Sequence, residues 1–152
     1  MPSPSDTAAL PPTSAAPGTA NQDAPRTLDP AVAAALSTDA SGLVAAIIQQ
    51  YDTLEVLMVG WMNEEALHRT LTSGRVTFWS RSRSEYWRKG DTSGHRQWVK
   101  AVALDCDGDA LLVTVDQEGA ACHTGTRTCF TGRGLSAVTG TRPDTGSTTG
   151  GL

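Results

Sequence analysis

Short apolar runs separated by polar turns fill the middle of the chain, and their lengths favour strands over helices. Five such runs predict strands, at 43–49, 55–59, 76–80, 98–104 and 110–115. The first two are separated by the short segment 50–53 and predict a β-hairpin. The last two flank Asp107-Gly108, a dipeptide typical of tight hairpin turns, and predict a second hairpin.

Two segments carry helix signals. Asn63 precedes two glutamates, leucines recur four residues apart, and Gly74 follows, so the pattern predicts a helix over 63–73. Asp29-Pro30 resembles an N-cap followed by proline in the first turn and predicts a short helix to about residue 36. Residues 81–97 are predicted to be mostly loop. The fold class expected is α+β, a small β-rich domain with two or three helices.

The distribution of prolines and aromatic residues predicts where the folded part lies. Six of the eight prolines fall within the first 25 residues, whereas all eight aromatic residues lie between Tyr51 and Phe130. We expect a disordered Pro/Ala-rich leader over 1–28, a folded domain over 29–137, and a flexible Gly/Thr tail over 138–152.

Charge and hydropathy exclude several classes of function. The chain has 152 residues and a net charge of −4, so no global basic field is available to hold nucleic acid. No apolar run approaches the roughly 20 residues that span a bilayer. The N-terminus lacks the basic segment followed by an apolar one that is typical of a secretory signal. We therefore expect a cytoplasmic location.

Three cysteines, Cys106, Cys122 and Cys129, are separated by fifteen and then six residues. This spacing matches no common zinc-finger pattern, and three buried, inert thiols are one interpretation. Their polar flanking residues favour metal binding instead. Three thiolates would leave a tetrahedral zinc ion with one open position, as in catalytic sites.

An acidic turn surrounds the first cysteine. Asp105, Asp107 and Asp109 alternate across it, so they form either an exposed turn or a site for one hard cation, Mg²⁺ or Ca²⁺. The twelve-residue EF-hand pattern is absent.

Residues 75–100 form a basic segment in an otherwise acidic chain. They hold seven of the twelve basic residues and only two acids, together with hydroxyl groups, glycines and three aromatic residues beyond position 85. A solvated loop and an RNA-binding patch are the alternatives, but guanidinium groups beside glycine backbone suit the phosphates of a small ligand better.

Several of these segments together resemble the phosphoribosyl-AMP cyclohydrolase family of histidine biosynthesis, in its monofunctional form. The resemblance extends over about 42–131, and its motifs lie at 61–67, 80–83, 87–94, 105–111, 122–125 and 129–130. It implies hydrolysis of the N1–C6 bond of the adenine ring in 1-(5-phosphoribosyl)-AMP, which gives a formimino-aminoimidazole-carboxamide ribonucleotide in the third step of the pathway. The preceding pyrophosphohydrolase step would then belong to a separate protein.

The resemblance also implies metals and an assembly. It implies an intertwined homodimer with one zinc ion per subunit, held by Cys106 of one subunit and by Cys122 and Cys129 of the other. Asp105, Asp107 and Asp109 correspond to the family's magnesium ligands.

The same resemblance, together with the local chemistry, suggests the remaining site residues. His123 adjoins a proposed zinc ligand and is the candidate for proton transfer. The candidates for substrate contacts are Arg81, Arg83, Trp87, Lys89, Ser93, Gly94 and His95. Asp91 departs from the family, which often has glutamate there, and its role is left open.

Two other classes of function are weaker. A zinc-dependent nucleobase deaminase would need the motifs H-x-E and P-C-x-x-C, and the sequence contains neither. A small phosphate-binding module with a structural zinc is the other class. A fourth protein ligand would favour it, whereas three cysteines, which leave the zinc site open, argue against it.

Overall fold

The computed structural model describes residues 27–146. The predicted leader lies almost entirely outside this range, as does the end of the predicted tail. Neither helix within residues 27–146 has the length and hydrophobicity that a membrane span requires.

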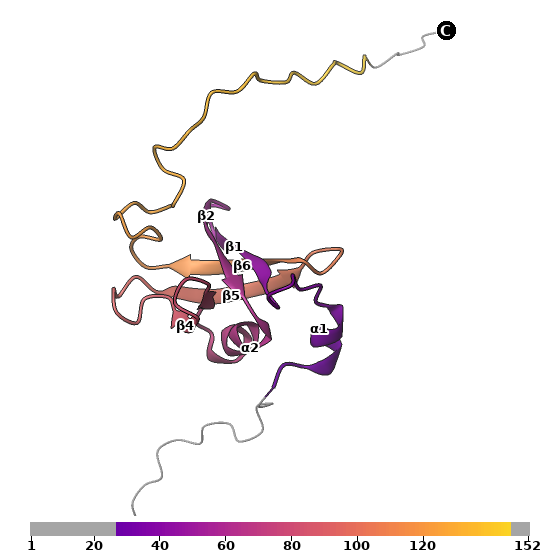
Figure 1. Cartoon of the computed structure of the whole chain (residues 1–152). Helices are drawn as coiled ribbons and strands as arrows, with labels where there is room; N and C mark the ends of the chain where they lie inside the picture. Colours follow the sequence, from indigo (N-terminus) through magenta and orange to yellow (C-terminus); the bar gives the residue numbers. More distant parts are fainter. Residues whose placement is uncertain (1–26, 147–152) are drawn as a thin grey trace, which may run out of the picture.

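A mixed four-stranded sheet forms the centre of the domain (Figure 1). Its strand order is β2-β1-β6-β5, and the strands are β1 (Val44–Gln50), β2 (Val56–Met62), β5 (Gln97–Leu104) and β6 (Ala110–Gln117). Both predicted hairpins are confirmed, because β1 pairs antiparallel with β2 and β5 pairs antiparallel with β6. The hairpins are joined through a parallel pairing of β1 with β6, which local sequence patterns do not predict.

Both predicted helices are present. In α1 (Pro30–Ala35), the Asp29 side chain accepts a hydrogen bond from Ala31 N at 2.7 Å, and proline occupies the first turn. In α2 (Glu64–Ser73), the Asn63 side chain caps the first turn through Ala66 N, and Gly74 ends the helix in the left-handed conformation with φ of 72°. The two helices and the strands confirm a small α+β domain.

A separate two-stranded hairpin contains one strand that the sequence analysis missed. Residues 81–97 are mostly loop, as predicted, but β4 (Glu85–Arg88) within them pairs with β3 (Thr77–Ser80). Aromatic residues face each other across this pair, with ring centroids 5.3 Å apart for Phe78 and Trp87. Cross-strand aromatic pairs stabilise a hairpin even where the intervening residues are charged and polar.

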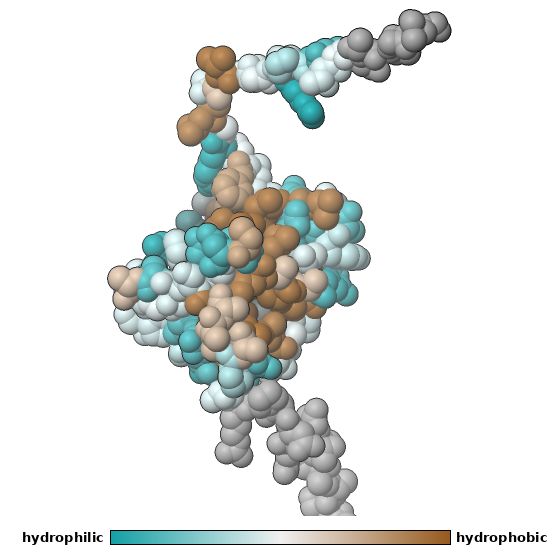
Figure 2. Space-filling model, turned by 90° about the vertical axis from the view of Figure 1, so that its right-hand side faces the viewer, coloured by the Kyte–Doolittle hydropathy of each residue, from teal (hydrophilic) through white to brown (hydrophobic). Residues whose placement is uncertain are grey.

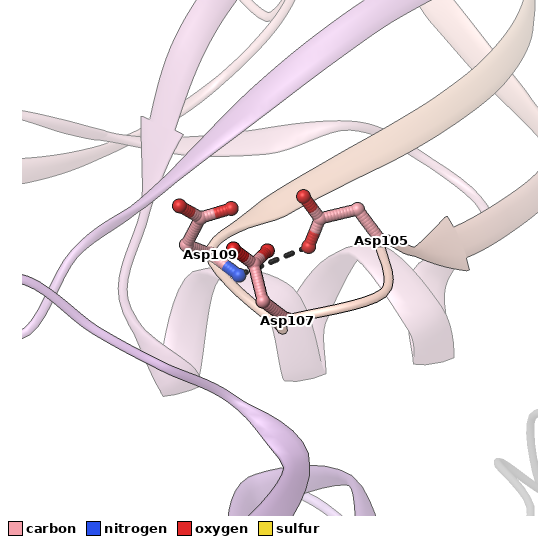
Figure 3. Close-up of side chains that lie close together, drawn as sticks. All are labelled: Asp105, Asp107 and Asp109. Carbon is pink, nitrogen blue, oxygen red and sulfur yellow. Dashed lines mark hydrogen bonds between the residues drawn. The ribbon is translucent and has the colours of Figure 1, made fainter.

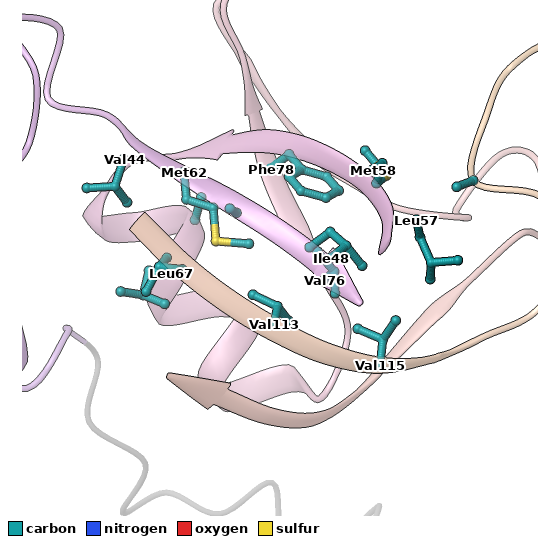
Figure 4. Packing of buried hydrophobic residues seen from close by; sticks show 14 of the residues in the cluster. Val44, Ile48, Leu57, Met58, Met62, Leu67, Val76, Phe78, Val113 and Val115 are labelled. Atoms are coloured by element: carbon teal, nitrogen blue, oxygen red, sulfur yellow. The ribbon is translucent and has the colours of Figure 1, made fainter. Parts of the chain in front are cut away.

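The hydrophobic core lies between the sheet, α2 and β3 (Figure 4). Phe78 is almost fully buried, and its ring lies against Gly60 of β2 so closely that no Cβ would fit there. Alternate residues of β1 and β6, such as Ile48 and Val113, enter the core. Their neighbours therefore project to the opposite face of the sheet.

That opposite face carries exposed apolar side chains. Ile47 of β1 pairs with Val59 of β2 on one side and with Leu112 of β6 on the other. Val59 is 47% exposed and Leu112 is 39% exposed. The side of the molecule that carries α1 also shows a strip of hydrophobic surface (Figure 2).

Candidate active site

A pocket of about 480 Å³ lies between the turn that follows β4 and the segment that follows β6. Seven of the residues singled out in the sequence line it, from the basic segment and from the cysteine segment. They are Trp87, Lys89, Ser93, His95, Cys122, His123 and Cys129. The structure therefore brings together residues up to 42 positions apart in the chain.

The turn after β4 has a tight shape that requires glycine. Gly90 has φ of 90°, and a Cβ there would lie 2.6 Å from the Arg96 backbone. The amide of Gly94 donates to the carbonyl of Gly90 at 2.9 Å, which closes the turn. Gly94 shapes this loop but does not line the pocket.

Lys89 is the one charged residue among the described residues whose side chain is buried, with an exposed fraction of 6%. Burial lowers its pKa, and the nearby sulfurs of Cys129 and Cys122 partly offset that effect. Its Nζ lies 5.7 Å from the ring centroid of Trp87. The pocket thus contains a cationic group beside two thiols.

Asp91 fixes the turn that carries this lysine. Its carboxylate accepts from Nε of Arg88 at 2.8 Å and from Nη2 of Arg75 at 3.2 Å. Arg75 also donates to the carbonyl of Lys89 at 2.9 Å. These hydrogen bonds, that of Arg88 first, lower the pKa of Asp91. Asp91, whose role the sequence analysis left open, therefore stabilises the turn after β4.

Cys122 and Cys129 lie in a short loop that folds back on itself. The Cys122 amide donates to the carbonyl of Thr126 at 3.2 Å, and the Cys129 amide donates to Leu57 of β2 at 2.8 Å. The Thr124 hydroxyl, 3.0 Å from the sulfur, is the main cause that lowers the pKa of Cys122 to about 6. Burial instead raises the pKa of the Cys129 thiol. The lowered pKa of Cys122 thus favours its thiolate form at neutral pH.

A buried glutamine holds the base of this loop. Gln117, the last residue of β6, donates from its side chain to the carbonyls of Gly119 at 3.1 Å and Arg127 at 2.9 Å. Its oxygen accepts from Gln97, which is fully buried, at 2.9 Å. Sequence reasoning missed both glutamines because an isolated Gln in a strand carries no recognisable signal.

The three aspartates converge at the turn between β5 and β6 (Figure 3). One carboxylate oxygen of each of Asp105, Asp107 and Asp109 lies within 4.8 Å of the others. Hydrogen bonding with Asp105, then with Asp107, and their negative charges raise the pKa of Asp109 to about 6. Crowded carboxylates of this kind suit a hard divalent cation.

Cys106 lies in this aspartate turn, exposed, and not in the pocket. The turn precedes β6, whereas Cys122 and Cys129 follow it, so the eight residues of β6, about 26 Å of extended chain, lie between them. Within residues 27–146, these three aspartates are the only group of at least three His, Cys, Asp or Glu side chains whose ligand atoms all lie within 4.8 Å of one another. The three cysteines do not converge within one chain.

Arg81 and Arg83 also lie outside the pocket. The Arg81 guanidinium stacks 4.5 Å from the ring centroid of Trp61 and lines a neighbouring hollow of about 520 Å³. Arg83 is exposed, and its Nη1 lies 3.8 Å from the carboxylate of Glu85. Trp87 lines both hollows and connects them.

Comparisons with known proteins agree on one family. The family model for phosphoribosyl-AMP cyclohydrolase matches residues 58–131. A phosphoribosyl-AMP cyclohydrolase of Arthrobacter sp. (strain FB24) is 79% identical over 109 residues, which cover 72% of this chain and 81% of that protein. One from Bifidobacterium longum (strain DJO10A) is 75% identical over 117 residues, 76% of this chain and 89% of that protein. One from Acidothermus cellulolyticus is 70% identical over 119 residues, with 78% and 84% covered.

Proposed function

Since the chain belongs to the phosphoribosyl-AMP cyclohydrolase family and is an enzyme of histidine biosynthesis, we propose that it opens the adenine ring of phosphoribosyl-AMP at a zinc site shared by two copies of the chain. The observation that carries this proposal is the position of the cysteines. Two lie together in the pocket, and the third lies at the other end of β6.

The cysteine pair fits a zinc ion chemically. Thiolates are the form of cysteine that binds zinc, and the hydrogen bond from Thr124 favours the thiolate of Cys122. Lys89 provides compensating positive charge close by. When bound, a zinc ion with an open position would act as a Lewis acid that makes water a better nucleophile at neutral pH.

The third ligand would come from Cys106 of a second copy. Within one chain, the length of β6 keeps this residue from reaching Cys122 and Cys129. The apolar row formed by Val59, Ile47 and Leu112 supports association, because folded monomers rarely leave large apolar patches exposed. One zinc ion per subunit follows from a symmetric dimer with two such sites.

In the proposed reaction, the oxygen of water bonds to C6 of the adenine ring, the C6–N1 bond breaks, and a proton is transferred to N1. His123 is exposed at the mouth of the pocket and adjoins Cys122, which suits it to carry that proton. Trp87 offers a ring face for the base. Lys89 and Ser93 line the same pocket, which supports a role for both in phosphate binding.

Arg81, Arg83 and the backbone at Gly94 complete the proposed phosphate contacts. Arg81 lines the neighbouring hollow, where its guanidinium is held over Trp61, and the substrate carries two phosphate groups at its two ends. A substrate that extends from one hollow into the other across Trp87 would bring each phosphate to basic residues.

We assign the proposed magnesium ion to Asp105, Asp107 and Asp109. Cys106 lies between two of these aspartates. Binding of its sulfur to zinc in the partner would therefore bring the aspartate turn beside the partner's pocket, so that both metals serve one site.

The direct test is turnover of phosphoribosyl-AMP with Mg²⁺ present, followed by absorbance as the purine ring opens, with zinc measured in the same sample. We expect about one zinc ion per chain, loss of turnover with a chelator and recovery with zinc. Full turnover in zinc-free protein would contradict the proposal.

A further inference from the structure

His95 packs against the start of the cysteine segment. The amide of Ala120 donates a hydrogen bond of 2.8 Å to Nδ1 of the imidazole. The ring lies so close to Gly119 that a Cβ there would be 2.8 Å from the same nitrogen. These contacts connect the basic turn to the cysteine segment and fix the position of the ring.

The Ala120 contact also determines which ring nitrogen carries the proton. Ala120 is buried, with an exposed fraction of 6%, and its amide has no other acceptor among the described residues. A buried backbone N–H requires an acceptor, so Nδ1 must be unprotonated. The carbonyl of Ala120 lies farther from Nδ1, at 3.3 Å, and would compete only if the amide lost its partner.

The neutral ring therefore carries its hydrogen on Nε2. No hydrogen bond to Nε2 from the described residues is present, and His95 lines the pocket. With Nδ1 occupied at the back of the ring, the imidazole has a single free donor.

We propose that His95 is a neutral hydrogen-bond donor to the substrate, with Nε2–H directed to an acceptor atom and with its tautomer fixed by the amide of Ala120. This inference rests on the proposed function, since it assumes that the substrate occupies this pocket. It gives the two histidines different tasks: His123 moves a proton, whereas His95 keeps its proton and binds. The acceptor is a phosphate oxygen or a purine nitrogen.

His95→Asn and His95→Asp give side chains of nearly the same shape, and together they distinguish a hydrogen-bond donor at this position from an acceptor. In His95→Asn, the side-chain oxygen can accept from Ala120 while the side-chain NH₂ donates into the pocket. In His95→Asp, one oxygen can still accept from Ala120, but the other presents an acceptor where a donor is needed. We expect His95→Asp to lose about 10- to 100-fold more of kcat/KM than His95→Asn, as for a lost hydrogen bond to a charged or polar partner.

A long-range ¹H–¹⁵N NMR spectrum of histidine-labelled protein reports the tautomer without any turnover. We expect a protonated Nε2 and an unprotonated Nδ1 for His95, and a shift of the Nε2 signal when a ligand binds. Ribose 5-phosphate and adenosine identify the acceptor: the first shifts the signal if the acceptor is a phosphate oxygen, the second if it is a purine nitrogen.

Three results would overturn the inference: a protonated Nδ1, equal activity in His95→Asp and wild type, or equal losses in His95→Asn and His95→Asp. Failure of the proposed function is distinguishable, because wild-type protein would then lack zinc-dependent turnover whatever the tautomer. Zinc content and melting temperature of each variant show that the comparison is made between folded proteins.

Discussion

The side-chain nitrogen of Gln117 donates a 2.9 Å hydrogen bond to the carbonyl oxygen of Arg127. Through this bond the last residue of β6 closes the base of the loop that carries Cys122. The sheet therefore helps to position Cys122 through a buried side chain, in addition to the loop's own backbone hydrogen bonds.

Replacing Gln117 with Glu tests this positioning. The size is retained, but a carboxylate would face the carbonyls of Gly119 and Arg127, which both need a donor. We expect a loss of about 1–3 kcal/mol in the free energy of unfolding and weaker zinc binding. Urea denaturation and a competitive zinc titration measure the two effects. Gln49→Glu is the control, because its amide bonds an exposed carbonyl at the hairpin turn and should have little effect on either.

Removing the imidazole of His123 tests proton transfer. His123→Ala leaves all three cysteines in place, so zinc content should stay the same while kcat falls by about 10²- to 10⁴-fold. Steady-state kinetics and metal analysis of one sample provide both values. A variant that keeps the wild-type kcat would show that His123 carries no proton in the rate-limiting step.

The lowered pKa of Asp91 predicts that the free energy of unfolding depends on pH. Its pKa is lowered in the folded state, chiefly by the hydrogen bond from Arg88, so the folded state binds the proton less readily than the unfolded state does. Its contribution is therefore complete above the ordinary aspartate pKa and is lost as pH falls through the lowered one. Asp91→Asn should reduce the free energy of unfolding by about 0.5–1 kcal/mol at neutral pH.

The same comparison in acid provides the check. The difference between wild type and Asp91→Asn should shrink towards zero as the pH falls below the ordinary aspartate range. Thermal denaturation at several pH values measures this difference, with Asp144→Asn, in the exposed C-terminal segment, as the matched substitution. A difference that is constant over this range would rule out the ion pairs as its source.

Local signals were enough to predict most elements. Caps at Asp29 and Asn63 and the glycine at position 74 bounded the two helices, and Asp107-Gly108 marked a hairpin turn. These features act within a few residues, so they can be recognised along the chain. The strand β4 was missed because its stability comes from pairing Trp87 with Phe78, a contact that the run of charged residues conceals.

The site was predictable in its residue types but not in its arrangement. Lys89, His95, Cys122 and Cys129 meet because β1 pairs in parallel with β6 and because the turn after β4 folds onto the cysteine segment. Both features depend on packing between distant segments. The separation of Cys106 from the other cysteines is likewise visible only once β6 is known to be an eight-residue strand between them.

The central claim, a zinc site shared between two copies, is tested most directly by mixing two inactive variants. Cys106→Ser retains the pocket cysteines, and Cys122→Ser retains the cysteine in the aspartate turn. Each alone should be inactive, because neither homodimer contains a complete set of ligands. After unfolding and refolding together, random pairing makes half of the dimers mixed, each with one intact site of two, so about one quarter of the wild-type turnover and zinc should return. Mixtures that stay as inactive as the separate variants would contradict a site built from two chains.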